Sequence, residues 1–153
     1  MFTISKRVFV NSATTQEPLL TREHVWEGLV LKAEDATRFV EVMTACHVLE
    51  RGDRFLLREV EVKSNKSRER VTFFPQHMVV FEPLDGPTQG LIKNEILEDD
   101  QGRLTVRFTF TFEMPNEEKK TEQAYAQNME KSYTAAVETT LATIRELVKE
   151  KKL

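Results

Sequence analysis

The chain has 153 residues, with 22 basic and 25 acidic side chains and a formal net charge of −3 at neutral pH. This length is typical of one domain, and we predict a single domain over residues 1–153. Hydrophobic residues make up 40% and charged residues 31%, which is ordinary for a soluble globular protein. The near balance of charge argues against a dedicated nucleic-acid-binding protein.

Membrane and secreted classes also fit poorly. The apolar runs are only a few residues long, so no segment can span a membrane. The first residues carry no apolar stretch of signal-peptide length, so we expect no secretory signal. Cys46 is the only cysteine, which excludes an internal disulfide and favours a cytoplasmic location.

The first third of the chain predicts a strand followed by two short helices. Residues 4–12 alternate in polarity as in a strand. Thr21 is a candidate N-cap, because Glu23 follows in what would be the first helical turn. Apolar residues then recur at helical spacing, and a second short helix is expected over residues 33–41.

From residue 43 the pattern changes to a period of two. Six strands are predicted, over residues 43–51, 54–63, 69–74, 77–82, 89–97 and 103–114. Gly52-Asp53 is a tight hairpin signal between the first two, and residues 63–68 read as a polar turn. The last strand alternates most clearly, with three phenylalanines on one face and threonines and arginines on the other. Such a strand belongs to an antiparallel sheet that is covered on one face only.

After Pro115 the chain has no further Gly or Pro, and residues 118–151 predict one long helix. Its apolar residues form a single stripe at spacings of three and four, which needs one curved partner surface. We therefore predict an α+β fold. A curved seven-stranded antiparallel sheet wraps around a long C-terminal helix, and two short helices follow the first strand.

Three segments carry a resemblance to a known group. They are Leu20-Thr-Arg-Glu-His-Val-Trp-Glu-Gly-Leu-Val-Leu-Lys-Ala33, the pair Phe55-Leu-Leu-Arg-Glu59 and Glu69-Arg-Val-Thr-Phe-Phe-Pro-Gln-His77, and Phe108-Thr-Phe-Thr-Phe-Glu113. With the order of elements, they resemble the START-like helix-grip (SRPBCC) superfamily, which includes the major birch pollen allergen, START domains and polyketide aromatase/cyclases. Within it, the chain is similar to a small bacterial and fungal family related to the L protein of the acetylaranotin cluster. The resemblance implies an apolar cavity between sheet and long helix, and it specifies no reaction.

The strand parity places polar residues among apolar ones on the inner face of the sheet. Arg58 shares its parity with Val60, and Asn94 shares its parity with Ile92 and Ile96. Because a buried polar group without a partner is costly, such residues are candidates for orienting a ligand. The alternative is structural: they lie at the open end, or they bond to one another and to Tyr133.

The candidate ligand-binding residues come from both sides of the expected cavity. Eight of the ten phenylalanines fall in predicted strands, so the sheet would supply an apolar wall and Tyr133 on the helix a polar tip. The full set is Arg58, Val60, Phe73, Phe81, Ile92, Asn94, Phe108, Phe110, Met129, Tyr133 and Val137. A plain packing role is the alternative for the apolar members.

No signature of a metal or nucleotide site is present. The histidines lack metal-ligand spacing, and phosphate-binding glycine motifs are absent, so we expect neither metal nor cofactor. Cys46 is most simply a small buried residue, and His77 could border a cavity mouth.

Three functions remain open. The first is binding of a small hydrophobic or aromatic molecule in the cavity. The second is an enzyme of the cyclase/aromatase or dehydratase type that acts by general acid–base catalysis through Arg58, Tyr133 or His77. The third is a ligand-free interaction module that forms a homodimer.

Overall fold

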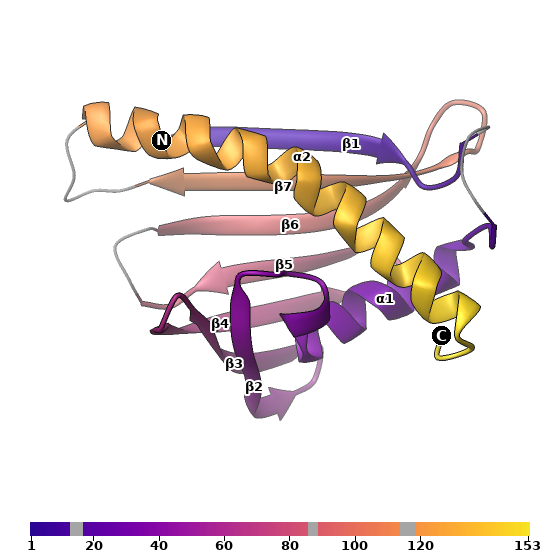
Figure 1. Cartoon of the computed structure of the whole chain (residues 1–153), viewed down its shortest axis with the longest axis horizontal. Coiled ribbons are helices and arrows are strands. Elements are labelled where there is room, and N and C mark those ends of the chain that lie inside the picture. Colours follow the sequence, from indigo (N-terminus) through magenta and orange to yellow (C-terminus); the bar gives the residue numbers. More distant parts are fainter. Residues whose placement is uncertain (13–16, 86–88, 114–118) are drawn as a thin grey trace.

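The computed structural model describes residues 1–12, 17–85, 89–113 and 119–153, without the side chain of Tyr133. These residues form the predicted α+β fold (Figure 1). The strands are β1 (Phe2–Phe9), β2 (Met43–Gly52), β3 (Phe55–Val62), β4 (Asn65–Phe74), β5 (Met78–Pro83), β6 (Gln89–Glu98) and β7 (Leu104–Glu113). The helices are α1 (Arg22–Glu34), the 3₁₀ helix η1 (Ala36–Arg38) and α2 (Lys119–Lys149).

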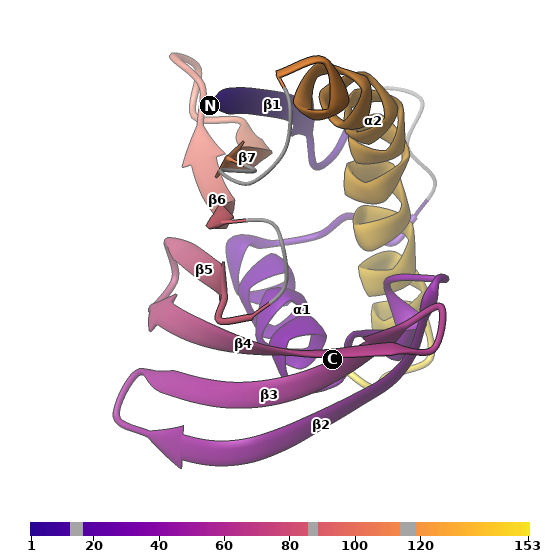
Figure 2. The ribbon, with the colours of Figure 1, turned by 90° about the vertical axis from the view of Figure 1, so that its left-hand side faces the viewer.

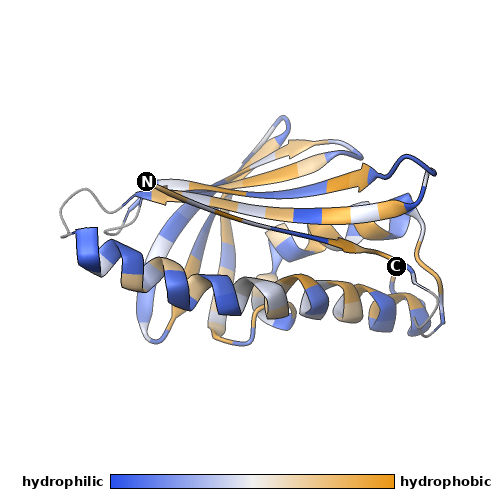
Figure 3. Cartoon of the chain, turned by 90° about the horizontal axis from the view of Figure 1, so that it is seen from above, coloured by the Kyte–Doolittle hydropathy of each residue, from blue (hydrophilic) through white to orange (hydrophobic). Residues whose placement is uncertain are grey.

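The strands form one antiparallel sheet in the order β1-β7-β6-β5-β4-β3-β2. From β2 to β7 each strand pairs with the next in the chain, and β1 closes the order by pairing with β7. The register sets Ile4 opposite Phe110, and Asn94 lies between Val79 of β5 and Phe108 of β7. Hydrophobic and hydrophilic residues alternate along the strands (Figure 3). This alternation gives the sheet one apolar face, as predicted.

Both helices lie on the concave side of the sheet (Figure 2). α2 contacts β1, β7 and α1, whereas α1 contacts β2, β5, β6 and α2. The two helices approach closely at Gly28, where an added Cβ would collide with the side chain of Ile144. The sheet and both helices share one hydrophobic core, whose buried members include Val25, Leu29, Leu56, Val71, Val79, Ile96, Phe108, Phe112, Ile144 and Leu147.

Several predicted boundaries were wrong. The first strand spans Phe2–Phe9 rather than residues 4–12, and the second short helix is reduced to the three residues of η1. The polar turn expected over residues 63–68 consists of Lys63 and Ser64, with φ angles of 51° and 68°, and β4 begins at Asn65. Parts of the expected loops at 13–18 and 83–87, and the junction before α2, lie outside the described residues.

Two of the phenylalanines assigned to the apolar wall do not face it. Phe9 is 47% exposed and Phe74 is 44% exposed. The ring of Phe9 lies 4.8 Å from the guanidinium carbon of Arg103. The inner wall is instead formed by phenylalanines of β4, β5 and β7. In the part of the chain that the structure describes, no helix is long and apolar enough to cross a membrane.

Candidate functional site

A lysine enters the interior from α1. The helix begins at the N-cap Thr21, whose side chain accepts a hydrogen bond from the His24 amide, while His24 Nδ1 accepts from the Thr21 amide. From this start, Val25, Leu29 and Lys32 follow at spacings of four and three and occupy one inward-facing stripe. The Lys32 side chain is therefore carried into the core, and the residue is only 9% exposed.

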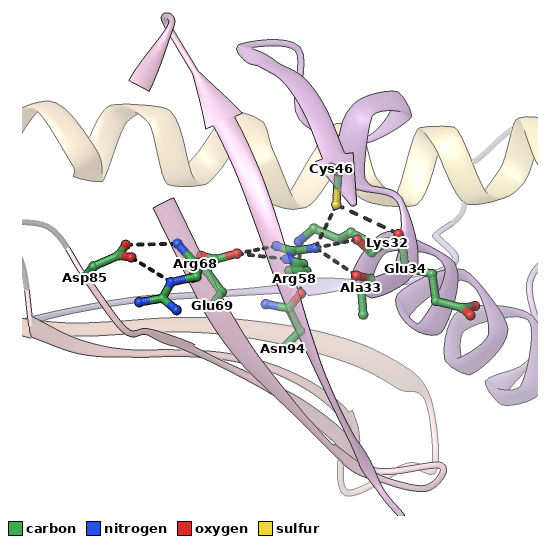
Figure 4. Close-up of polar contacts among 9 residues, drawn as sticks. All are labelled: Lys32, Ala33, Glu34, Cys46, Arg58, Arg68, Glu69, Asp85 and Asn94. Carbon is green, nitrogen blue, oxygen red and sulfur yellow. Dashed lines mark hydrogen bonds and ion pairs between the residues drawn. The ribbon is translucent and has the colours of Figure 1, made fainter. Parts of the chain in front are cut away.

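The amine of Lys32 meets an asparagine on the sheet (Figure 4). Lys32 Nζ donates a hydrogen bond of 2.9 Å to Asn94 Oδ1. The same nitrogen lies 4.4 Å from the ring centre of Phe108 and 5.5 Å from that of Phe81. Asn94 is fully buried, and its Nδ2 has no hydrogen-bond partner among the described residues. Nearly all buried polar atoms in proteins are paired, so this free donor distinguishes the site.

Arg58 is bound to other groups of the protein. It is 3% exposed, and its Nε and Nη2 donate to Glu69 Oε1 at 2.8 and 2.7 Å. Its Nη1 donates to the carbonyl oxygens of Lys32 and Ala33, each at 3.0 Å, and lies 3.8 Å from Cys46 Sγ. These carbonyls are at the end of α1, so Arg58 satisfies acceptors that the helix leaves open and complements its negative end.

These contacts favour a structural role for Arg58 over a role in orienting a ligand, although its partners differ from the expected Asn94 and Tyr133. Arg58 and Asn94 do not bond to each other directly. They are linked through Lys32, whose backbone oxygen accepts from Arg58 and whose amine donates to Asn94. Because Arg58 and Glu69 face each other in the register of β3 and β4, the sheet holds this ion pair in place.

The electrostatics of the cluster act on Lys32. The pKa of its amine is lowered from the usual 10.5 to about 7, chiefly by burial and also by the positive charge of Arg58, while Glu69 acts in the opposite direction. A buried ammonium is disfavoured where no anion compensates it. Glu69 is already paired with Arg58, so the charge of Lys32 is the uncompensated one. Near neutral pH this amine can therefore take up or release a proton.

The apolar candidates belong to the main hydrophobic core or pack against it, with one exception. Phe81, Phe108, Phe110 and Val137 are buried in the main core, and Phe73, Ile92 and Met129 pack against it half-buried. Val60 instead belongs to a small separate cluster with Ala36 and Cys46. The side chain of Tyr133 lies outside what the structure describes. Two members of the polar cluster, Lys32 and Glu69, were not among the predicted site residues.

The two remaining candidates, His77 and Cys46, differ in their surroundings. His77 is exposed in the turn between β4 and β5. Cys46 is buried, as expected, with Sγ 3.9 Å from the backbone oxygen of Glu34. Among the described residues, no three His, Cys, Asp or Glu side chains gather closely enough to hold a metal ion.

The chain is similar in structure to several solved proteins. The Zhui aromatase/cyclase from Streptomyces sp. R1128 superposes with a TM-score of 0.77 at 13% identity, over 96% of this chain and 95% of that one. The Aha1 dimer from Colwellia psychrerythraea gives 0.61 at 11% identity, over 95% and 97%. Ara h 8.0201 gives 0.60 at 8% identity, over 94% and 97%. These superpositions establish the helix-grip fold. At such low sequence identity they establish nothing about function.

Comparison of sequences identifies the family of the chain, which structural similarity does not. No curated protein matches the chain significantly. Residues 5–151, however, match the family described as Acetylaranotin biosynthesis cluster protein L, which spans nearly the whole chain. The predicted helix-grip fold and family resemblance are thus both confirmed. The chain belongs to the AtaL family, the acetylaranotin biosynthesis cluster protein L family, and has the helix-grip fold.

Proposed function

We propose that the protein binds a small hydrophobic or aromatic molecule between the inner face of the sheet and α2, with its polar group at Lys32 and Asn94. The observation that carries this proposal is the Nδ2 of Asn94, which is fully buried beside Lys32 Nζ and has no hydrogen-bond partner in the part of the chain that the structure describes. A buried donor without a partner costs about 1–3 kcal/mol. A ligand oxygen at this place would satisfy the donor and remove that cost.

The surroundings support an apolar guest. The rings of Phe81 and Phe108 flank the amine, and Phe110 stacks on Phe112 at 4.8 Å between ring centres. Half-buried apolar residues from both layers, Ile92 on β6 and Met129 on α2, pack against this wall. An apolar wall with a few convergent polar groups is the usual composition of a small-molecule site.

A blocking variant tests the proposal. Purified protein is screened against aromatic and aliphatic compounds by native mass spectrometry and thermal shift. Ile92→Trp adds bulk to the inner face at a half-buried position, so we expect it to abolish binding of any hit. Leu91→Trp is the matched control, because the neighbouring Leu91 is 37% exposed. If the Ile92→Trp variant folds by circular dichroism and still binds like wild type, the ligand does not lie between sheet and helix.

A second candidate function is general acid–base catalysis of the cyclase/aromatase or dehydratase type. Lys32 would act in it, in place of the Arg58, Tyr133 or His77 expected from the sequence. The observation that favours it is the pKa of about 7, which suits proton transfer near neutral pH. A neutral Lys32 amine would take a proton from the carbon next to a ligand carbonyl and return it later. The test is the exchange of the hydrogens next to the carbonyl of 4-phenyl-2-butanone for deuterium in D₂O, which NMR follows. Enzyme-dependent incorporation that is lost in Lys32→Met supports catalysis, and equal rates with and without protein refute it for this ketone class.

The third candidate function, a ligand-free interaction module that forms a homodimer, stays a proposal that ranks below ligand binding and catalysis. Light scattering of the purified protein measures its mass directly. A stable dimer that binds none of the screened compounds would favour the interaction module over the binding protein.

A further inference from the structure

The polar end of the site is rich in donors and poor in acceptors. Asn94 Oδ1 already accepts a hydrogen bond from Lys32 Nζ, whereas Asn94 Nδ2 finds no acceptor among the residues that the structure describes. A protonated Lys32 carries three N–H groups, and one hydrogen bond to it is observed among the described residues. Two neighbouring groups thus have N–H hydrogens for which the described residues offer no acceptor oxygen. A guest that completes this site must bring acceptors.

The charges at the site favour an anionic acceptor. Arg58 and Glu69 form a compensated pair, so a protonated Lys32 leaves one positive charge in excess. The flanking rings of Phe81 and Phe108 attract a cation, but they carry no net charge and do not replace a counter-ion. A negative charge on the guest would both balance Lys32 and use the free donor.

We propose that the site selects hydrophobic carboxylic acids, whose carboxylate pairs with the protonated amine of Lys32 and accepts a hydrogen bond from Asn94 Nδ2. This proposal rests on the proposed binding function and adds the chemical class of the ligand. Arg58 holds the end of α1 and Glu69 in place, and so positions Lys32 without contacting the guest.

Proton linkage follows from this arrangement. The groups that act electrostatically on Lys32 are Arg58 from β3 and Glu69 from β4, while β5 and β6 face it with the Phe81 ring and the Asn94 amide. α2 meets α1 through Ile144, and Arg145 beside it is bound to the backbone oxygens of Pro18 and Val10. Lys32 is therefore the group that gains a proton when a carboxylate binds.

The expected size of this effect can be worked out. With a pKa of about 7 in the free protein, affinity for a carboxylate should fall about tenfold from pH 6 to pH 8. At pH 8, binding should take up about 0.9 proton per site, because most Lys32 is neutral before binding. Primary amides of the same acids carry no charge, so their affinity should change little over this range.

The experiment uses two matched pairs of probes. They are 2-naphthoic acid with 2-naphthamide and decanoic acid with decanamide, titrated calorimetrically at pH 6, 7 and 8 in two buffers of different ionisation enthalpy. The measured quantity is the ratio of acid to amide affinity. For wild type and for Leu91→Trp, we expect this ratio to fall about tenfold from pH 6 to pH 8. For Lys32→Met, we expect a lower ratio that does not change with pH.

A further variant tests the role of the anion. Asn94→Asp would place a carboxylate of the protein beside Lys32 and remove the free donor, so it should reduce the acid-to-amide ratio at pH 6 at least tenfold. If acids and amides bind wild type equally at every pH, the carboxylate proposal is overturned while the binding function stands. If neither class binds, the proposed function itself fails.

Discussion

The buried amine of Lys32 makes the stability of the fold depend on pH in a defined direction. Its pKa is about 7 in the folded protein and 10.5 in its usual state, so the unfolded chain binds the proton first as the pH falls. The group therefore lowers stability progressively from about pH 10.5 to about pH 7, and the penalty is nearly constant below that. Replacing Lys32 with Met removes the titration and keeps an apolar side chain of similar length.

The magnitude follows from the two pKa values. At pH 7 the penalty is about 4 kcal/mol, and it falls by about 2 kcal/mol between pH 7 and pH 9. Lys32→Met also loses the hydrogen bond to Asn94 Oδ1 and leaves that acceptor buried, which costs about 1–3 kcal/mol. We therefore expect Lys32→Met to be more stable than wild type at pH 7 by about 1–3 kcal/mol, and expect this gain to shrink by about 2 kcal/mol at pH 9.

Guanidinium chloride unfolding at pH 6, 7, 8 and 9 measures the difference, because other titrating groups cancel between the two proteins. Val79→Ala is the control: Val79 is buried opposite Asn94 in the sheet and does not titrate. It should cost about 2 kcal/mol at every pH. If the difference between wild type and Lys32→Met were the same at pH 7 and pH 9, the reasoning about a desolvated amine would be refuted.

Other predictions test how the site is held. Arg58→Met should cost about 3–5 kcal/mol in denaturant unfolding, because it leaves the carboxylate of Glu69 and the last carbonyls of α1 without their donor; a cost below about 1 kcal/mol would contradict this role. Gly28→Val should destabilise by about 1–3 kcal/mol through collision with Ile144, and Ile144→Ala in the same chain should relieve the strain, as a double-mutant cycle would report. Thr21→Ala should lower the free energy of unfolding by about 1 kcal/mol, and Thr21→Ser should restore it.

The sequence was most informative where one pattern ran uninterrupted. Strict alternation over residues 103–114 predicted β7, which spans Leu104–Glu113, and the long stretch without Gly or Pro predicted α2 to within two residues at either end. Both signals come from burial on one face, which leaves little freedom for an alternative assignment. With the order of elements, they determined the architecture.

Turns were harder because their signals were ambiguous. The hairpin between β3 and β4 turns at Lys63 and Ser64, both with positive φ. Such turns usually carry Asn or Gly, so two residues without that preference gave no indication of where the turn lies. A run of polar residues therefore read as a longer loop, although Asn65 already belongs to β4.

The polar site was predictable in part from parity. Parity placed Arg58 and Asn94 inside, and both are buried there. The same rule applied to β4 would have placed Glu69 on the face of Val71. Lys32 also had a signal, since it follows Val25 by seven residues and Leu29 by three on the buried stripe. Long charged side chains usually extend from such positions to solvent. Lys32 was therefore not predicted to be buried.

The cost of Lys32 also bears on why such a residue would be kept in this fold. A penalty of about 4 kcal/mol at neutral pH is a large share of the 5–15 kcal/mol that stabilises a typical domain. Selection for stability alone would favour an apolar residue there, because within the described residues the buried amine finds one acceptor and Asn94 Nδ2 finds none. A guest carboxylate would supply the counter-charge and the missing acceptor together. Such a guest should therefore raise the unfolding temperature of wild type more than that of Lys32→Met, a difference that thermal shift measures directly.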